Sequence, residues 1–165
     1  MSTNLCHTKF ESPIGQIVIE GDESSVTGLY LPGHKGWNGP AEGSRPSDQC
    51  FTNVRGQLEQ YFAGERQTFD VPLKSAGTPF QERVWQALRA IPYGRTMTYA
   101  QLAGCVGQPA ASRAVGAANG RNPISILVPC HRVVGANGRL TGYAGGLDAK
   151  QWLLEWEASH ASIER

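Results

Sequence analysis

The sequence predicts a mixed α/β (α+β) protein, with a small N-terminal β-sheet and one helix over residues 1–75 and a helical second half over 76–165. Short β-branched runs separated by polar turns fill the first third of the chain, and capping boxes open successive helices after it. A length of 165 residues, 40% of them hydrophobic, suffices for one compact domain or two small ones. The charged fraction of 18% excludes a disordered chain.

In the first half, residues 15–20 and 26–31 are β-branched and aromatic runs typical of strands, and 68–73 predicts one more strand. Over 48–63 the apolar residues recur at helical spacing. Gly64 follows, at a position suited to end that helix.

The second half begins with two helix-start signals. Thr78 and Gln81 form a capping box around a proline, and Thr98 and Gln101 repeat the pattern. A glycine-containing turn then leads into a third helix over 110–119. Two short helices joined by a tight turn predict a winged helix-turn-helix-like domain, although any αα-hairpin looks alike.

The charge is unevenly distributed along the chain. The net charge is +1, but residues 83–147 contain seven arginines and no Asp or Glu. Nothing in that stretch would repel a polyanion such as DNA. The alternative is chance in an arginine-preferring composition.

The third predicted helix is rich in alanine, and Ser112 and Arg113 are its main polar side chains. A helix that reads bases in the major groove needs several Asn, Gln, Arg or Lys side chains. If this helix binds DNA, it should therefore bind with little sequence preference. Alternatively it is a buried helix that needs small residues for packing, and one helix can do both with opposite faces.

Four scattered cysteines form no C-x-x-C pair, so we expect free thiols in a reducing compartment. Adjacent Cys6 and His7 either help to bind a metal or belong to a frayed terminus. No apolar run approaches a membrane span, and residues 1–10 lack a signal-peptide core. We therefore expect a soluble, cytoplasmic protein without membrane association.

The most apolar segment of the second half, 124–128, runs into Pro129-Cys130-His131-Arg132. An unperturbed thiol is only about 3% ionised at pH 7, so a nucleophilic cysteine needs a neighbouring base or cation. Neighbouring side chains on an extended backbone point to opposite sides. A bridging water or a sharp turn must therefore connect His131 to Cys130.

A partner for His131 is expected from the C-terminal helix, which Asp148 is predicted to cap. At about 100° per residue, Glu157 falls on the apolar face of that helix while Glu155 points away. A carboxylate on an apolar face needs a partner, which would give a Cys–His–Glu relay. Alternatively Glu157 extends to solvent near the C-terminus.

The segment Val128-Pro129-Cys130-His131-Arg132-Val133-Val134 resembles the signature of the O6-alkylguanine-DNA alkyltransferases, the methylated-DNA–protein-cysteine methyltransferases. The resemblance covers nearly all of residues 77–157. It extends through Gly94 to Tyr99, Arg113-Ala114-Val115-Gly116, Asn122-Pro123 and Gly142-Tyr143-Ala144-Gly145-Gly146.

The resemblance implies a role for each matched residue. Cys130 would be the acceptor thiol, His131 would act on it through a water, Glu157 would orient His131, and Asn122 would be the hinge to the active-site loop. The implied residues for DNA and substrate binding are Tyr99, Arg113, Arg132, Tyr143, Ala144 and Gly145. Ala144 stands where some relatives carry serine, so a hydroxyl contact to O6 is lacking.

The implied function is direct-reversal DNA repair. The alkyl group of O6-alkylguanine, and of O4-alkylthymine, would pass irreversibly to Cys130 after the nucleotide flips out of the duplex. The protein would act once, without cofactor or metal, as a monomer that binds double-stranded DNA from the minor groove, independently of sequence. The alternatives are a non-catalytic lesion-binding or regulatory helix-turn-helix protein, and a cysteine hydrolase.

Overall fold

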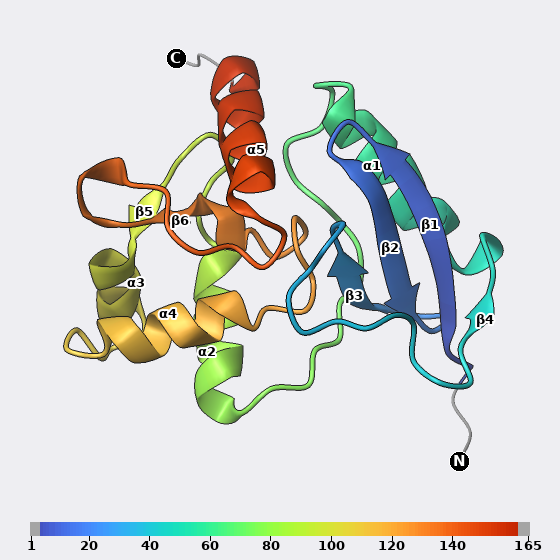
Figure 1. The fold of residues 1–165 in the computed structure, drawn as a ribbon, viewed down its shortest axis with the longest axis horizontal. Coiled ribbons are helices and arrows are strands. Elements are labelled where there is room, and N and C mark those ends of the chain that lie inside the picture. Colours follow the sequence, from blue (N-terminus) through green and yellow to red (C-terminus); the bar gives the residue numbers. More distant parts are fainter. Residues whose placement is uncertain (1–3, 162–165) are drawn as a thin grey trace.

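The computed structural model describes residues 4–161, in which a four-stranded sheet lies beside a group of helices (Figure 1). The strands of the sheet are β1 (Cys6–Ser12), β2 (Gly15–Gly21), β3 (Val26–Tyr30) and β4 (Arg45–Pro46). Their order is β3-β2-β1-β4, with β4 parallel to β1 and the other pairs antiparallel. One helix of this half, α1 (Thr52–Phe62), is entered through a 3-10 turn at Gln49–Phe51.

The structure confirms both predicted strands at the start of the chain and adds β1 before them. Cys6, Thr8 and Phe10 are buried, whereas His7 and Lys9 are not, which is the alternation of a strand with one face in the core. The interpretation of Cys6 and His7 as a frayed terminus is therefore wrong. Among residues 4–161, no group of three or more His, Cys, Asp or Glu side chains is placed to hold a metal.

The predicted strand over 68–73 does not form. Only Leu73 makes a bridge, parallel to Val26. The backbone of Asp70 is bound by a side chain instead: its N–H donates to Gln57 Oε1 at 2.9 Å and its carbonyl accepts from Gln57 Nε2 at 3.1 Å. A side chain of α1 thus occupies the groups that a neighbouring strand would need.

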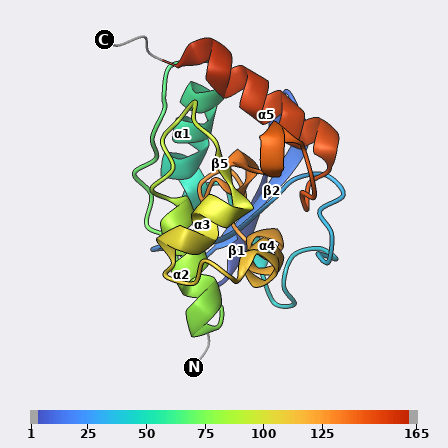
Figure 2. The same cartoon turned by 90° about the vertical axis from the view of Figure 1, so that its left-hand side faces the viewer.

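The second half contains α2 (Pro79–Leu88), α3 (Tyr99–Cys105), α4 (Ser112–Gly120), α5 (Leu147–His160) and a small parallel sheet of β5 (Met97–Thr98) and β6 (Val133–Val134). Both predicted capping boxes are present, at Thr78 with Gln81 and at Thr98 with Gln101. Figure 2 shows α2, α3 and α4 clustered in front of the sheet and α5 running across the top.

Two helix starts differ from the prediction. Helix α4 begins at Ser112, because residues 109–110 still form a turn. Helix α5 is preceded by Gly146, whose φ of 97° favours glycine. Asp148 lies exposed in the first turn and makes no capping hydrogen bond, so it is not the predicted cap. Its charge still suits the positive end of the helix dipole.

The two halves share one continuous core. The segment that leads to Cys130 adds to the edge of β3: Leu29 N–H donates to Pro123 O at 2.9 Å, and Ser125 N–H donates to Leu29 O at 3.1 Å. The division into units 1–75 and 76–165 stays a prediction. Over residues 4–161, no helix is long and apolar enough to cross a membrane.

Candidate active site

Cys130 lies at the end of the buried segment 124–128 and is itself only 4% exposed. Residues Cys130–Arg132 form a 3-10 turn, η2, rather than the extended backbone assumed from the sequence. The turn begins after Pro129, whose φ and ψ of −80° and 65° lie outside the helical region. Cys130 and His131 therefore lie on a sharp turn, but no hydrogen bond joins their side chains among residues 4–161.

Glu157 is the hub of a buried hydrogen-bond network. Its Oε2 atom accepts from His131 Nε2 at 2.8 Å, from Arg132 Nη2 at 3.0 Å and from Tyr61 Oη at 2.6 Å, and its Oε1 accepts from Arg132 Nε at 2.8 Å. The side chain of Glu157 is 1% exposed. Its predicted contact with His131 is therefore present, and the alternative of a solvent-exposed Glu157 is wrong.

This network determines the protonation state of its members. Burial raises the pKa of Glu157, but the hydrogen bonds from His131 and Arg132 and the guanidinium charge of Arg132 outweigh it and hold that pKa well below its usual range. Burial lowers the pKa of His131, which the carboxylate of Glu157 only partly opposes. A neutral His131 whose Nε2–H donates to Glu157 has a free lone pair on Nδ1, and that atom has no partner among residues 4–161.

Arg132 does not fit the DNA-binding role expected for it. Its guanidinium is buried, donates twice to Glu157 and once to Ile91 O at 2.6 Å, and lies 5.7 Å from the ring centre of Tyr93. A buried carboxylate needs a positive partner, and Arg132 provides it. Arg132 therefore supports Glu157, and its buried guanidinium is not available for the DNA contact expected from the sequence.

Asn122 connects the end of α4 to the active-site turn. Its Nδ2 donates to Val128 O at 2.9 Å, and its Oδ1 accepts from Ile124 N–H at 3.0 Å. Asn119, which the sequence analysis did not single out, reaches Cys130 O at 3.5 Å from the last turn of α4. Burial raises the pKa of the Cys130 thiol, whereas hydrogen bonding from Asn122 opposes the rise.

The glycine-rich loop before α5 brings Tyr143 to the same region. Tyr143 is 6% exposed, burial raises the pKa of its phenol well above 10, and its hydroxyl has no partner among the described residues. Its phenol therefore stays protonated and able to donate. Gly145 packs so closely on Leu31 that a Cβ would lie 3.0 Å from the Leu31 side chain. Ala144 is half-buried and its carbonyl accepts from Lys35 N–H at 2.9 Å.

Tyr99 and Arg113 lie on the helix-turn-helix. Tyr99 opens α3, its ring packs beside Gly116 of α4, and its hydroxyl accepts from Thr141 Oγ1 at 3.3 Å. Arg113 is exposed on α4, with no side-chain hydrogen bond or ion pair within residues 4–161. Val115 of the same helix is buried, so α4 combines a packed face with an open one, as both readings of its composition allowed.

Besides Asn119, two further residues of the site were not predicted from the sequence. Tyr61 lies in α1, and no local sequence pattern could predict its hydrogen bond to Glu157, which is so distant in the chain. Lys150 is completely buried in α5, where its Nζ donates to Thr141 O at 2.7 Å. Its position seven residues before Glu157, on the same helical face, was the available signal.

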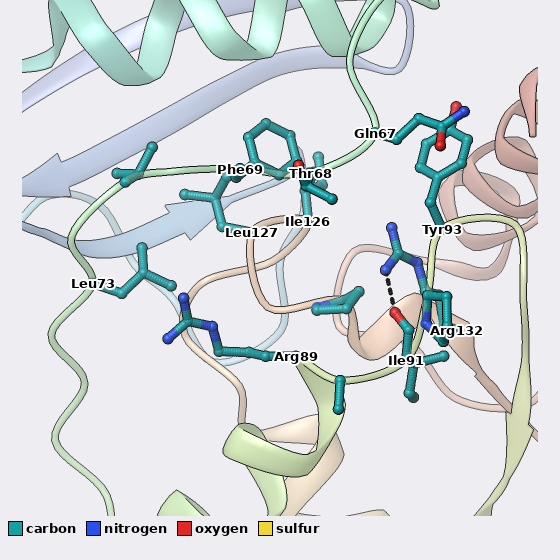
Figure 3. A pocket seen from close by; sticks show the side chains of 14 residues that line it. Gln67, Thr68, Phe69, Leu73, Arg89, Ile91, Tyr93, Ile126, Leu127 and Arg132 are labelled. Carbon is teal, nitrogen blue, oxygen red and sulfur yellow. Dashed lines mark hydrogen bonds between the residues drawn. The ribbon is translucent and has the colours of Figure 1, made fainter. Parts of the chain in front are cut away.

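A cavity of about 300 Å³ lies behind the active-site turn (Figure 3). Its lining comes from the segment before α2, from residues 89–93 after α2, and from the segment around the active-site turn, namely Gln67, Thr68, Phe69, Val71, Leu73, Ile126, Leu127, Pro129 and Arg132. Arg89 and Arg132 both reach toward it (Figure 3). Cys130 is not among its lining residues. We therefore do not assign this cavity to the substrate of the thiol.

Comparison with known proteins links both halves to one family. Residues 79–159 match the sequence profile of the 6-O-methylguanine DNA methyltransferase DNA binding domain. Residues 5–75 match that of the 6-O-methylguanine DNA methyltransferase ribonuclease-like domain.

Curated relatives match over nearly their full length. The chain is 53% identical to a methylated-DNA–protein-cysteine methyltransferase of Methanosarcina acetivorans, covering 91% of this chain and 96% of the relative. It is 46% identical to a constitutive methylated-DNA–protein-cysteine methyltransferase of Bacillus subtilis, and the match covers 92% of this chain and 94% of the relative. The crystal structure of Mycobacterium tuberculosis OGT in complex with DNA superposes with a TM-score of 0.89 at 46% identity, covering 95% of each chain.

Proposed function

The chain belongs to the methylated-DNA–protein-cysteine methyltransferase family, and we therefore propose that Cys130 is the thiol that accepts the alkyl group. The enzyme transfers methyl groups from methylated DNA to a cysteine of its own chain, and this repairs the DNA. The observation that carries the assignment is the buried Glu157 network, which orients His131 within the same turn as Cys130.

We propose that His131 removes the thiol proton. The carboxylate of Glu157 fixes the Nε2–H tautomer, which leaves the Nδ1 lone pair as the base. The proton would pass from Cys130 to Nδ1 directly or through one water. Because burial raises the pKa of the thiol, formation of the thiolate requires such a base.

The bond changes follow from these roles. The thiolate of Cys130 attacks the alkyl carbon in line with the bond to O6, a carbon–sulfur bond forms, and the carbon–oxygen bond breaks. The departing guanine takes a proton at O6 from Tyr143, whose phenol stays protonated. The thiol proton, held by His131, restores the phenol, so the balanced products are guanine and a thioether.

We propose that α3 and α4 engage DNA from the minor groove, independently of sequence. The open face of α4 carries Arg113, which would fill the gap left by the flipped nucleotide, and Tyr99 would press on the adjoining phosphate. Six of the seven arginines in residues 83–147 are exposed, namely Arg83, Arg89, Arg95, Arg113, Arg121 and Arg139. These side chains can neutralise phosphates without reading bases.

The proposed substrates are O6-alkylguanine and, with it, O4-alkylthymine, in double-stranded DNA. Both lesions present an alkyl carbon on an exocyclic oxygen to the thiol. Action as a monomer, without cofactor and in the cytoplasm, stays a prediction.

Transfer of radiolabelled methyl groups from O6-methylguanine DNA tests the assignment. Wild type and Cys105→Ser, which removes an exposed thiol, should become labelled equally. Cys130→Ser should remain unlabelled and still bind DNA. Labelled Cys130→Ser protein would disprove the acceptor role. Turnover of an ester by the wild type would favour a hydrolase, and intact repair in cells by Cys130→Ser would favour a regulatory binding protein.

A further inference from the structure

The cavity behind the active-site turn has no role in the proposed repair reaction. Its volume is about 300 Å³, at the lower end of the range for small-molecule sites. Its lining combines the segment before α2 with the segment around the active-site turn, and ligand sites occur preferentially where two structural units meet. A ligand in this cavity would therefore be small and would contact both halves of the chain.

The charge around this cavity has one sign. Among residues 4–161, Arg89 and Arg132 line it and no Asp or Glu does. Figure 3 shows the two arginines on opposite sides of the cavity. The charge of Arg132 is compensated by Glu157, whereas Arg89 is exposed and has no ion pair within the same residues. One uncompensated cation without an acid favours a monoanion, held at the side of Arg89.

The side of Arg132 offers hydrogen bonds rather than net charge. Each guanidinium nitrogen of Arg132 donates once, Nε and Nη2 to Glu157 and Nη1 to Ile91 O. Both Nη atoms carry one more N–H group. The buried hydroxyl of Tyr93, which also lines the cavity, has no partner within the described residues. These groups suit a neutral hydroxyl on the ligand.

The remaining lining selects an apolar body between these two polar ends. Apart from the two arginines, Gln67 and Thr68, every lining residue is aliphatic, aromatic or proline. The apolar and aromatic side chains that Figure 3 labels are Phe69, Leu73, Ile91, Tyr93, Ile126 and Leu127. An aromatic ring would bury this surface, whereas a small inorganic anion would not.

The wall that contains Ile126 is fixed by its backbone. Leu127 N–H donates to Ser125 O at 2.8 Å, and this bond closes a tight turn in which Ile126 has a φ of 72°. A β-branched residue with positive φ is strained, and such a conformation persists only where the surrounding structure holds it. This wall is therefore formed before a ligand arrives, which lowers the entropic cost of binding.

We propose that this cavity binds a small aromatic carboxylate with a hydroxyl group at its far end, of the type of para-hydroxybenzoate. The carboxylate pairs with Arg89, the ring packs on the apolar lining, and the hydroxyl exchanges hydrogen bonds with Arg132 and Tyr93. Because Cys130 does not line the cavity, this site is distinct from the one that presents the alkyl group to the thiol.

Titration of the full chain with para-hydroxybenzoate tests the proposal. Methyl NMR spectra report binding, and the methyl groups of Leu73, Ile126 and Leu127 locate it. Para-hydroxybenzamide is the neutral counterpart of this probe, and inorganic phosphate is an anion without a ring. Arg89→Met removes the charge and keeps an unbranched side chain. Arg83→Met is the matched control, since it removes an exposed arginine of α2 that does not line the cavity.

We expect saturable shifts of these methyl signals with para-hydroxybenzoate. Binding should be about tenfold weaker or more for the benzamide and for Arg89→Met, because each loses a charge-assisted hydrogen bond, and Arg83→Met should bind as the wild type does. Equal affinities of Arg89→Met and the wild type, or no saturable shift at these three residues, would overturn the site. Phosphate binding as tight as that of para-hydroxybenzoate would overturn the aromatic carboxylate as its ligand.

Discussion

Tyr61 donates a hydrogen bond of 2.6 Å to Glu157, a residue 96 positions later in the chain. The acceptor is the same Oε2 atom that receives His131 Nε2. Through this bond, helix α1 of the N-terminal half holds the carboxylate that orients the histidine of the C-terminal half. The N-terminal half is thus part of the site rather than only a neighbour of it.

Tyr61→Phe should therefore weaken both stability and alkyl transfer. It removes one donor to a buried carboxylate and keeps the ring, so the free energy of unfolding should fall by about 1.5–3 kcal/mol. Chemical denaturation measures this loss. Tyr30→Phe is the control, since its hydroxyl makes no hydrogen bond within the described residues. Equal effects of the two substitutions would contradict the role of the Tyr61 bond.

The stability of the wild type should decrease in acid partly because of Glu157. The pKa of this carboxyl is lowered in the folded state, so its stabilisation is complete above the unfolded value near 4.5 and is lost as the pH falls below it. Glu157→Gln should flatten this acid decrease. At pH 7 the same substitution should cost about 3–5 kcal/mol, because Arg132 loses its counter-charge. Urea unfolding of the wild type and Glu157→Gln between pH 3 and 7 measures the free energy of unfolding of each. Parallel dependences of that free energy on pH would contradict the role of Glu157.

Local signals in the sequence predicted the elements that depend on local chemistry. The capping boxes at Thr78 and Thr98 were found because each is a reciprocal pair three residues apart. The prediction of a strand over 68–73 was wrong because Gln57 of α1 binds the backbone N–H and carbonyl of Asp70, which a neighbouring strand would have needed. No window of sequence contains that competition.

The site divides in the same way. Cys130, His131 and Asn122 lie within a few residues of one another, and helical periodicity placed Glu157 correctly. The predicted DNA contact of Arg132 was wrong because the sequence does not distinguish an arginine that binds phosphate from one that binds a buried carboxylate. Its role depends on the packing of α5 against η2, which only the fold supplies.

Arg113→Ala should impair repair within duplexes more than reaction with free O6-benzylguanine. The exposed Arg113 is proposed to act on the extruded state of DNA, and it has no contact with the network around Cys130. Transfer rates on the two substrates measure the difference. Comparable losses on both would remove Arg113 from the flipping step.

Binding to undamaged DNA should fall steeply with rising salt and vary little with sequence, because exposed arginines neutralise phosphates and α4 offers few base-reading groups. Titrations at several salt concentrations on duplexes of different sequence measure both properties. A preference above about 10³ for one undamaged sequence is inconsistent with this mode of binding.

The most direct test of the acceptor mechanism is the stoichiometry of repair, read together with the mass of the modified peptide. With excess O6-methylguanine DNA, each protein molecule should repair one guanine and stop, because no group in the site can cleave a thioether. The added methyl group should lie on the peptide that contains Cys130, and His131→Ala should slow the transfer without changing this endpoint. Repair of more than one guanine per protein molecule, or a methyl group found only on Cys6, Cys50 or Cys105, would contradict the mechanism.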